Sequence, residues 1–358
     1  MHRLGHRQPQ VVRKSAAALE SKLPEPSVTV VIPTLAADLR LRECLQALAK
    51  QTRRDFEIIV VDNSGRQLVR AGGMPGDATV LEQEHNIGYG AAINLGFQRS
   101  RTPFLASLND DAVPRPRWIE ALLASAEAHP EAGMFASQVR FYGEEHLDSA
   151  GMVISGDASS KQRGHLFPVA EFDREEEVLL PSASAALYRR TMLEEVGLFD
   201  EDFFLYCEDT DLGLRARWAG WKCVYVPAAV VDHHYSHSAG RASRLKAYYV
   251  ERNRLYVALK NFPAGMLCAV PFRTMVRYWW HARSVALGRG TAAQFRREGN
   301  SRFQLVWIVV QAHGSCLRHA HSLWRKRLDI RRRARLSAAD FGQLLRTHSI
   351  PARRVAEL

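Results

Sequence analysis

Short apolar segments and amphipathic segments alternate through the first half of this chain. Four runs rich in Val, Ile and Leu have the length of buried strands: 27–35, 56–62, 79–83 and 103–108. Between the first two, apolar residues recur at every third or fourth position, as at Leu41, Leu45 and Leu48. That spacing is typical of helices with one buried face. Strands alternating with such helices predict βαβ units, and therefore an α/β domain with a mostly parallel sheet flanked by helices.

The second half of the chain is less regular. A strand is expected at 133–140, followed by a hairpin or irregular excursion of the chain at 141–157. Residues 159–177 are polar and are expected to form a loop, which is either mobile or a simple insertion. Before them, Pro114 and Pro116 predict the start of the helix that carries Trp118. Two short strands are expected at 223–227 and 230–234. Beyond Gly240 the pattern becomes helical, and several basic helices carry aromatic residues: Trp279, Trp280, Phe303, Trp307 and Trp324.

The length of 358 residues suits one α/β domain and an appendage. We therefore divide the chain into a disordered basic leader at 1–26, a catalytic domain at 27–240 and a helical basic region at 241–358. The leader lacks an apolar run of signal-peptide length, and no stretch reaches the roughly 20 apolar residues needed to span a bilayer. The five cysteines form no CxxC pair, which favours a reducing compartment over a disulfide framework. A cytoplasmic protein is expected.

The net charge of +11 is unevenly distributed along the chain. Residues 27–238 carry 20 Lys and Arg against 31 Asp and Glu, whereas residues 239–358 carry 24 against five. A basic C-terminal third has two candidate partners, nucleic acid and an anionic membrane surface. Nucleic-acid binding would favour arginines interleaved with exposed aromatic residues on a sheet or recognition helix. The aromatic residues here follow helical spacing instead, so we expect the membrane surface and no nucleic acid.

Polar residues follow each predicted strand of the first half. They are Pro33 and Thr34, then Asp62 and Asn63, then Asn86 and Gly88, and finally Asn109, Asp110 and Asp111. Each set alone could consist of ordinary turn residues. In an open parallel sheet, however, ligands bind beyond the carboxyl ends of the strands. Four such sets in succession predict a ligand site at that edge.

The stretch from Phe203 to Trp221 concentrates acidic residues at the start of a predicted helix. Glu208, Asp209 and Asp211 follow an aromatic run, and Gly220 is a candidate C-terminal cap. Acidic side chains there could simply interact with the helix dipole. They could instead act as general acids or bases, as paired carboxylates also do in glycan hydrolases.

The spacing of Asn109 and Asp111 places two oxygen ligands on one side of an extended segment. Mg²⁺ or Mn²⁺ in phosphate-processing sites needs little more than one or two carboxylates, water and substrate phosphates. His233, His234 and His237 form a second candidate ligand set. A zinc site is disfavoured because no Glu lies between His233 and His237, and a surface histidine cluster is the plain alternative.

Residues 28–238 resemble a family 2 glycosyltransferase with the GT-A fold, particularly its rhamnosyltransferase-like branch. The matching segments, in order, are VVIPT at 30–34, VVDNS at 60–64, NIGYGAAINLG at 86–96, LNDDA at 108–112, GLFDEDFFLYCEDTDLGLRARWAGW at 197–221 and VDHHYSHS at 231–238. The resemblance implies a nucleotide-sugar donor, a divalent cation and inversion at the anomeric carbon.

Carried over to this chain, the resemblance implies a role for each motif residue. Asp209 is the expected catalytic base, with Glu208 beside it, and the metal ligands are Asp111, Asn109 and His233, with His234 competing for the last place. The expected nucleotide-binding residues are Pro33, Thr34, Asp62, Asn63, Asn86, Gly88 and Asp110. Asn109 replaces the first acid of the usual D-x-D motif, which makes the expected cation site less negative.

The sequence therefore predicts an inverting glycosyltransferase that uses Mg²⁺ or Mn²⁺ and acts at the inner face of the cell membrane. Its donor is expected to be dTDP-L-rhamnose and its acceptor a hydroxyl of a cell-surface glycan or a lipid-linked sugar. A UDP-hexose donor is the alternative, because Thr34 and Asp62 suit uracil and thymine equally. A nucleic-acid-binding protein and a glycan hydrolase are the more distant alternatives.

Overall fold

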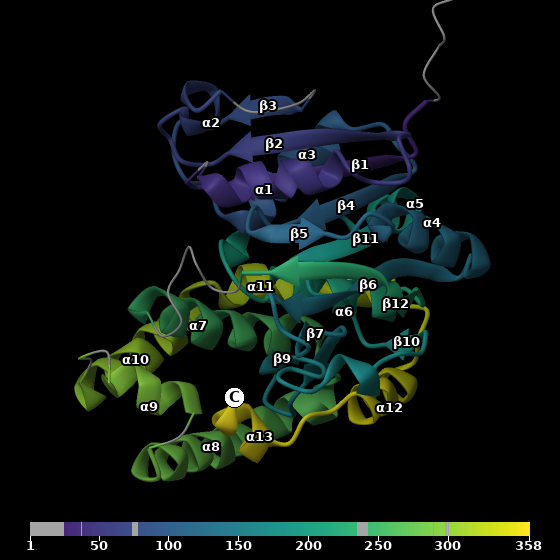
Figure 1. Ribbon diagram of the computed structural model, residues 1–358. Coiled ribbons are helices and arrows are strands. Elements are labelled where there is room, and N and C mark those ends of the chain that lie inside the picture. Colours follow the sequence, from purple (N-terminus) through teal and green to yellow (C-terminus); the bar gives the residue numbers. More distant parts are fainter. Residues whose placement is uncertain are drawn as a thin grey trace, which may run out of the picture.

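One twisted sheet runs through the upper part of the molecule, and most of the C-terminal helices gather below it (Figure 1). The computed structural model describes residues 25–358 except 37, 74–77, 235–242, 289, 298 and 300. The expected domain boundary at residue 240, and His237, lie outside the described residues.

The main sheet has the strand order β10-β12-β6-β11-β4-β1-β2-β3. Strands β1, β2, β3 and β4 are parallel, as are β6 and β12, whereas β11 lies antiparallel between β4 and β6. The bounds of these strands are Val28–Thr34 (β1), Phe56–Asp62 (β2), Thr79–Glu82 (β3), Phe104–Leu108 (β4), Ala132–Phe141 (β6), Glu176–Val178 (β10), Ala185–Arg189 (β11) and Lys222–His233 (β12). Two short strands extend it, Ala112–Pro114 (β5) beside β12 and Leu147–Ser149 (β7) beside β6. A separate hairpin consists of Met152–Ile154 (β8) and Ser160–Gln162 (β9).

The helices of the catalytic domain connect these strands. They are Leu39–Leu48 (α1), Leu68–Ala71 (α2), Tyr89–Arg99 (α3), Trp118–Ala128 (α4), Arg190–Val196 (α5) and Glu208–Trp218 (α6). The C-terminal region is helical, as expected: Arg244–Asn261 (α7), Ala264–Ala286 (α8), Gly290–Arg297 (α9), Arg302–Arg318 (α10), Ala320–Arg332 (α11), Ala338–Thr347 (α12) and Ala352–Glu357 (α13). No helix in the described residues has the length and apolar character required to cross a bilayer.

Three local expectations were wrong. Pro114 does not start the helix of Trp118; it ends β5, where it pairs with Val231 of β12. Residues 159–177 are not a mobile loop, because they contain β9 and the start of β10 and both pair with other strands. The two strands expected at 223–227 and 230–234 form the single strand β12, interrupted by a register shift between Val226 and Val230. That shift explains why the sequence pattern looks broken there.

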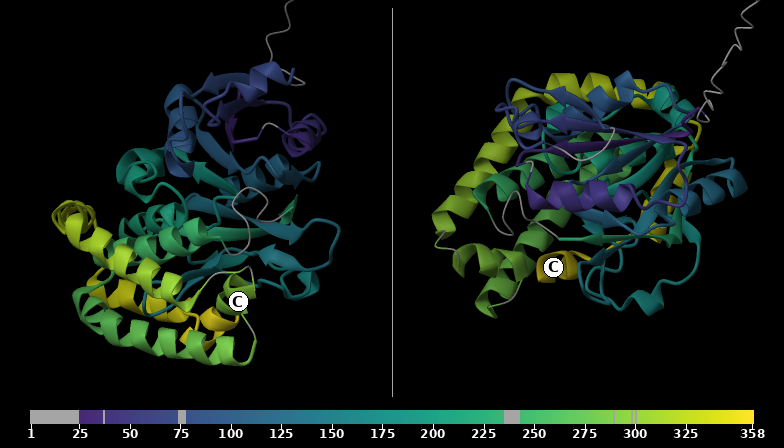
Figure 2. Two further views of the ribbon diagram at one scale, coloured as in Figure 1. Left: turned by 90° about the vertical axis from the view of Figure 1, so that its left-hand side faces the viewer. Right: turned by 45° about the horizontal axis from the view of Figure 1, so that its top comes forward.

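The C-terminal helices share a hydrophobic core with the catalytic domain. Trp218 of α6 stacks on Phe341 of α12 with ring centroids 3.8 Å apart. The same buried cluster includes Phe203 before α6 and Tyr256 on α7, whose rings meet edge to face. Burial of aromatic side chains is a major source of packing energy. The helical region therefore packs against α6 of the catalytic domain. The turned views show its green and yellow helices packed against the rest of the molecule (Figure 2).

A buried ion-pair network reinforces that contact. The ammonium of Lys260 on α7 lies 2.5 Å from Asp200 and 2.7 Å from Asp211 of α6. Arg215 binds the other oxygen of Asp211, and Lys326 of α11 binds Asp200. Burial opposes ionisation of Asp211, but the charges of Lys260 and Arg215 hold its pKa below the usual value.

Replacing Lys260 by Met should destabilise the protein strongly. The substitution keeps most of the side-chain volume but leaves two buried carboxylates short of a cation, which typically costs about 3–5 kcal/mol. Lys326→Met is the matched control, because Lys326 is partly exposed and such pairs contribute about 0–1 kcal/mol. Urea denaturation of the two variants provides the measurement. Equal free energies of unfolding for both variants would contradict this account of the network.

Candidate active site

The two acidic clusters singled out in the sequence are joined by one short segment, residues 182–184. Ser184 accepts a hydrogen bond at its carbonyl from the backbone N–H of Asn109, at 2.9 Å. Its neighbour Ala183 donates its N–H to Asp209 Oδ2, at 3.3 Å. Tyr89, which begins α3, donates its hydroxyl to the carbonyl of Ala183. The strand end that carries Asn109, the helix that carries Asp209 and the loop before α3 therefore meet at one place.

Asp111 and His233 form the core of the first cluster. His233 Nε2 lies 3.0 Å from Asp111 Oδ1 and 3.3 Å from Asn109 Nδ2. The other ring nitrogen, Nδ1, lies 2.8 Å from Asp148 Oδ2. Burial would lower the pKa of His233, but Asp111 and Asp148 together raise it to about 10. A carboxylate behind a histidine fixes the orientation of the ring, as in many metal sites.

His234 points to different partners. Its Nε2 lies 3.0 Å from Glu43 on α1, and its ring stacks on that of Tyr142 with centroids 3.9 Å apart. The hydroxyl of Tyr142 donates to the same carboxylate. Of the two histidines left open by the sequence, His233 is the one whose ring contacts the Asp111 carboxylate, whereas His234 contacts Asp111 through its backbone N–H, which donates to the Asp111 carbonyl.

The residues of this cluster fit a divalent cation as a partial ligand set. Mg²⁺ binds octahedrally at about 2.0–2.1 Å, so its adjacent ligands are separated by about 3 Å. The distance of 3.0 Å between Asp111 Oδ1 and His233 Nε2 matches that separation, and a cation there would have to displace the proton that Nε2 shares with Asp111. Within the described residues, however, no three His, Cys, Asp or Glu side chains form a group that could hold a metal. Further oxygens, such as those of a donor diphosphate, would have to complete the coordination shell.

Asp62 and Asn63 organise the loops of the expected nucleotide site. The carboxylate of Asp62, a residue only 1 % exposed, accepts hydrogen bonds from Ser64 and from the N–H of Val69 in α2. Burial alone would raise the pKa of Asp62, but these hydrogen bonds hold it below its usual value. Asn63 bridges to the next loop, because its amide contacts Asn86 Oδ1 and the carbonyl of Gly88. Their direct contact with a nucleotide stays a prediction.

The other predicted nucleotide-binding residues lie at the ends of β1 and β4 and at the start of α3. Pro33 is buried within β1, and Thr34 ends that strand. Thr34 hydrogen-bonds the side chain of Asp110, while burial raises the pKa of Asp110 to about 6. Gly88 adopts a φ of +92°, and a Cβ there would lie 2.5 Å from the carbonyl of Phe204. Only glycine fits this close approach of two backbones.

Glu208 and Asp209 form a coupled pair at the start of α6. Burial and the neighbouring charge of Asp209 raise the pKa of Glu208 to about 8, and Glu208 Oε2 has no hydrogen-bond partner in the described part of the chain. Burial also raises the pKa of Asp209, although three N–H and O–H donors from Ala183 and Thr210 oppose this effect. Asp209 is the more exposed of the two. Burial and mutual repulsion thus disfavour two negative charges on the pair, and the hydrogen bonds to Asp209 favour its ionised form over that of Glu208.

Asp211 does not belong to this pair. It is fully buried and binds Lys260, Arg215 and Asn261, so it cannot contact an acceptor hydroxyl. From the sequence, Asp211 could interact with the helix dipole or act as a general acid or base. The structure shows instead that it anchors α6 to α7.

Two residues that support the site were missed in the sequence. Asp148 orients His233 from β7, and Asn253 on α7 donates its amide to the carbonyls of Phe203, Leu205 and Tyr206. Both act on segments far away along the chain, and neither belongs to a recognisable motif. Only the folded structure, which brings these residues next to the segments they contact, reveals their role.

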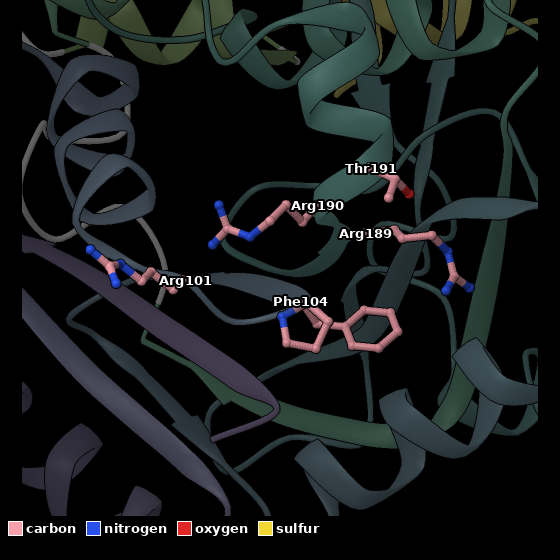
Figure 3. A pocket seen from close by; sticks show the side chains of 6 residues that line it. Arg101, Phe104, Arg189, Arg190 and Thr191 are labelled. Atoms are coloured by element: carbon pink, nitrogen blue, oxygen red, sulfur yellow. The ribbon is translucent and has the colours of Figure 1, made fainter. Parts of the chain in front are cut away.

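A depression of about 390 Å³ lies elsewhere, at the opposite end of the sheet (Figure 3). It is lined by Arg101, Pro103, Phe104, Arg189, Arg190 and Thr191. Arg189 and Arg190 donate to backbone carbonyls, and the lining contains no carboxylate. Because Phe104 begins β4 while Asn109 follows its end, this depression is separate from the candidate site.

Comparisons with known proteins agree with the motifs. Residues 29–197 match glycosyl transferase family 2. The chain is 30 % identical over 300 residues to N-acetylglucosaminyl-diphospho-decaprenol L-rhamnosyltransferase of Mycobacterium tuberculosis, covering 75 % of this chain and 95 % of that protein. The chain belongs to glycosyl transferase family 2. A second glycosyltransferase of that bacterium, the pre-mycofactocin glycosyltransferase, is 28 % identical over 232 residues, covering 62 % of this chain and 46 % of the relative.

Solved structures support the predicted GT-A fold of this glycosyltransferase. GalNAc-T7 with UDP, GalNAc and Mn²⁺ matches with a TM-score of 0.55 at 15 % identity, over 83 % of this chain and 58 % of that one. The mannosyltransferase PcManGT of Pyrobaculum calidifontis, in complex with GDP-Man and Mn²⁺, matches with a TM-score of 0.51 at 17 % identity, over 82 % and 87 %. The prediction of a GT-A fold with a C-terminal helical region is confirmed.

Asp209→Asn should lower turnover by about 10²–10⁴-fold, the usual contribution of a general base, with donor affinity nearly unchanged. Glu208→Gln should be milder, because glutamine mimics the protonated carboxyl. Since the pKa of Asp209 is raised and its ionised form is needed, kcat/KM should fall on acidification at a pH above the usual carboxyl range. Steady-state kinetics from pH 5 to 9, with donor binding measured separately, test both variants. An inactive Glu208 variant beside an active Asp209 variant would reverse the two roles.

Proposed function

We propose that this glycosyltransferase transfers L-rhamnose from dTDP-L-rhamnose to a sugar hydroxyl of a lipid-linked acceptor, with inversion at the anomeric carbon. The observation that carries the proposal is the alignment with a rhamnosyltransferase along 95 % of that protein's length. That relative's name specifies an N-acetylglucosaminyl-diphospho-lipid. The acceptor proposed here belongs to the same class, a sugar linked to a lipid through a diphosphate. A UDP-hexose donor remains the second candidate, since one structural neighbour contains UDP and a hexosamine.

The geometry supports a direct displacement. Asp209 is partly accessible, and hydrogen bonds from Ala183 and Thr210 favour its ionised form, so it can accept the proton of the attacking hydroxyl. The neutral Glu208 beside it adds no second negative charge near the acceptor. Asp111, His233 and Asn109 would hold a divalent cation, which supplies positive charge to the departing diphosphate. Both structural neighbours contain Mn²⁺, which supports a metal here too.

The donor and the metal can be tested in one set of assays. We expect the highest kcat/KM with dTDP-rhamnose, compared with UDP-glucose, UDP-galactose and UDP-N-acetylglucosamine on the same lipid-linked acceptor. An apolar pocket rejects an added hydroxyl only by about 10²-fold, so slow use of other donors is expected. Excess chelator should abolish turnover, and Asp111→Ala should remove both turnover and Mn²⁺-dependent donor binding.

Asp173→Ala is the control for these assays, because Asp173 is an exposed acid outside the candidate site. Preference for a UDP-hexose would overturn the donor assignment alone. Full activity in chelator would overturn the metal requirement.

A place of action at the inner face of the membrane is supported by α10. Five apolar side chains project from it at helical spacing into solvent: Phe303, Val306, Trp307, Val310 and Leu317. Phe303 is 86 % and Leu317 78 % exposed. A helix with such a face in a basic region is suited to lie in a lipid interface. Exposed Phe272, Met275 and Trp279 on α8 provide a second apolar surface.

The double variant Phe303→Gln/Trp307→Gln should bind phosphatidylglycerol vesicles about tenfold or more weakly, since burying one such side chain contributes about 1.5–3 kcal/mol. Leu39→Gln is the control, because Leu39 is 81 % exposed on α1 in the catalytic domain. Vesicle sedimentation and light scattering are measured together. Unchanged vesicle binding would contradict the proposal, and a fall in molecular mass would assign the face to contact with a second subunit.

A further inference from the structure

A strained turn precedes α6, the helix that carries the candidate base. Phe204 has a φ of +61° and a ψ of −55°, and the N–H of Leu205 donates to the carbonyl of Phe203 at 2.7 Å. These values define a γ-turn of the rare kind, which has a positive φ at its central residue and is strained. Tyr206 and Cys207 follow with φ values of +68° and +65°. Such a backbone persists only where contacts from outside the segment hold it.

The turn directs its carbonyl groups to two different partners. The side-chain amide of Asn253 on α7 donates to three of them within residues 203–206, at distances of 2.6–2.9 Å. The carbonyl of Phe204 instead accepts the N–H of Tyr89, the first residue of α3, at 2.8 Å. The segment that leads to Asp209 is therefore shared between α7 and the loop before α3.

Arg252 fixes the orientation of the Asn253 amide. Its Nε can only donate and lies 2.8 Å from Asn253 Oδ1, so the Nδ2 atom of the amide faces the carbonyl groups. The same guanidinium donates to the carbonyls of Asp202 and Phe203 and lies 4.7 Å from the ring centre of Tyr249. Because Asn253 is fully buried, the carbonyl groups would lose their donor if its amide were removed.

The position of this turn affects the geometry between the candidate base and the donor. Asp209 follows the turn on one side, while Gly88 of the expected nucleotide site lies so close on the other that a Cβ there would be 2.5 Å from the Phe204 carbonyl. Asn63 also holds the Gly88 loop, independently of α7. If the turn relaxed, Asp209 would therefore move relative to a nucleotide whose own loop stays anchored. A misplacement of about 1 Å can lower a rate by about 10²-fold.

We propose that Asn253 is a positioning residue for the candidate base. Its amide holds the strained turn, and the turn sets the position of Asp209 relative to the bound donor. Asn253 itself contacts neither substrate. This inference rests on the proposed role of Asp209 as the base, but it does not depend on which sugar is transferred.

Two variants of the full chain test the role of the amide. Asn253→Ala removes it, and Asn253→Asp keeps its shape but replaces the donor by an acceptor, so a role in packing alone would survive the second change. Both should lower kcat by about 10²-fold with the nucleotide sugar that the wild-type chain uses best. Calorimetric affinity for the matching nucleoside diphosphate with Mn²⁺ should stay nearly unchanged, because that loop is held by Asn63.

Gln51→Ala is the matched control for these variants. Gln51 is a 1 % exposed amide whose hydrogen bonds also go to backbone groups, those of Arg115 and Ile119, away from the candidate site. Its loss should cost stability but leave kcat as in the wild type. Hydrogen exchange followed by mass spectrometry adds a readout that needs no donor. Asn253→Ala should raise exchange at 86–92 and 203–211, and Gln51→Ala should not.

The proposal is overturned if Asn253→Ala keeps the kcat of Gln51→Ala, or if exchange at 86–92 and 203–211 is the same in both. A fall in nucleotide affinity as large as the fall in kcat would also overturn it, because Asn253 would then act on the donor site. The expected losses in a protein that prefers a UDP-hexose would refute only the donor assignment. A wild-type chain inactive with every donor would refute the proposed function, and hydrogen exchange would then decide whether Asn253 holds the turn.

Discussion

The candidate active site depends on a strained backbone segment that the C-terminal region holds in place. Phe204, Tyr206 and Cys207 all have φ values between +61° and +68°, a region that costs residues with side chains energy. Such a conformation persists only where its surroundings fix it. Asn253 supplies that restraint, since its amide contacts three carbonyls of residues 203–206, and Arg252 also donates to the carbonyls of Asp202 and Phe203. These contacts from α7 thereby fix the position of the helix that begins with Glu208.

The same segment also fixes the loop before α3. The N–H of Tyr89 donates to the carbonyl of Phe204 at 2.8 Å, and Gly88 allows the two backbones to approach. Asn63 then ties this loop to the end of β2. A continuous series of contacts thus runs from α7 through the segment just before the candidate base to the loops of the expected nucleotide site. The C-terminal helices therefore help to position the candidate site, in addition to their proposed role in membrane binding.

Local patterns in the sequence predicted most of the sheet and both acidic clusters. The strands β1, β2 and β4 are continuous apolar runs because both of their faces are buried, and such runs are visible in isolation. By contrast, β9 and β10 are three residues long and polar, and they exist only through pairing with β8 and β12. The roles of Asp148 and Asn253 are equally invisible in the sequence. Their significance comes from partners that are distant along the chain, which no spacing rule encodes.

The net charge of the C-terminal third, +19 over residues 239–358, overstates the charge available to a membrane. Lys260, Lys326 and Arg335 pair with carboxylates of the acidic catalytic domain. These cations bind the two parts of the chain to each other, which explains why opposite charges accumulate in neighbouring regions. Electrostatic attraction to lipid is also screened by salt within about 10 Å. The exposed apolar face of α10 is not subject to either effect, so it is the feature that gives the proposed membrane contact its strength and its orientation.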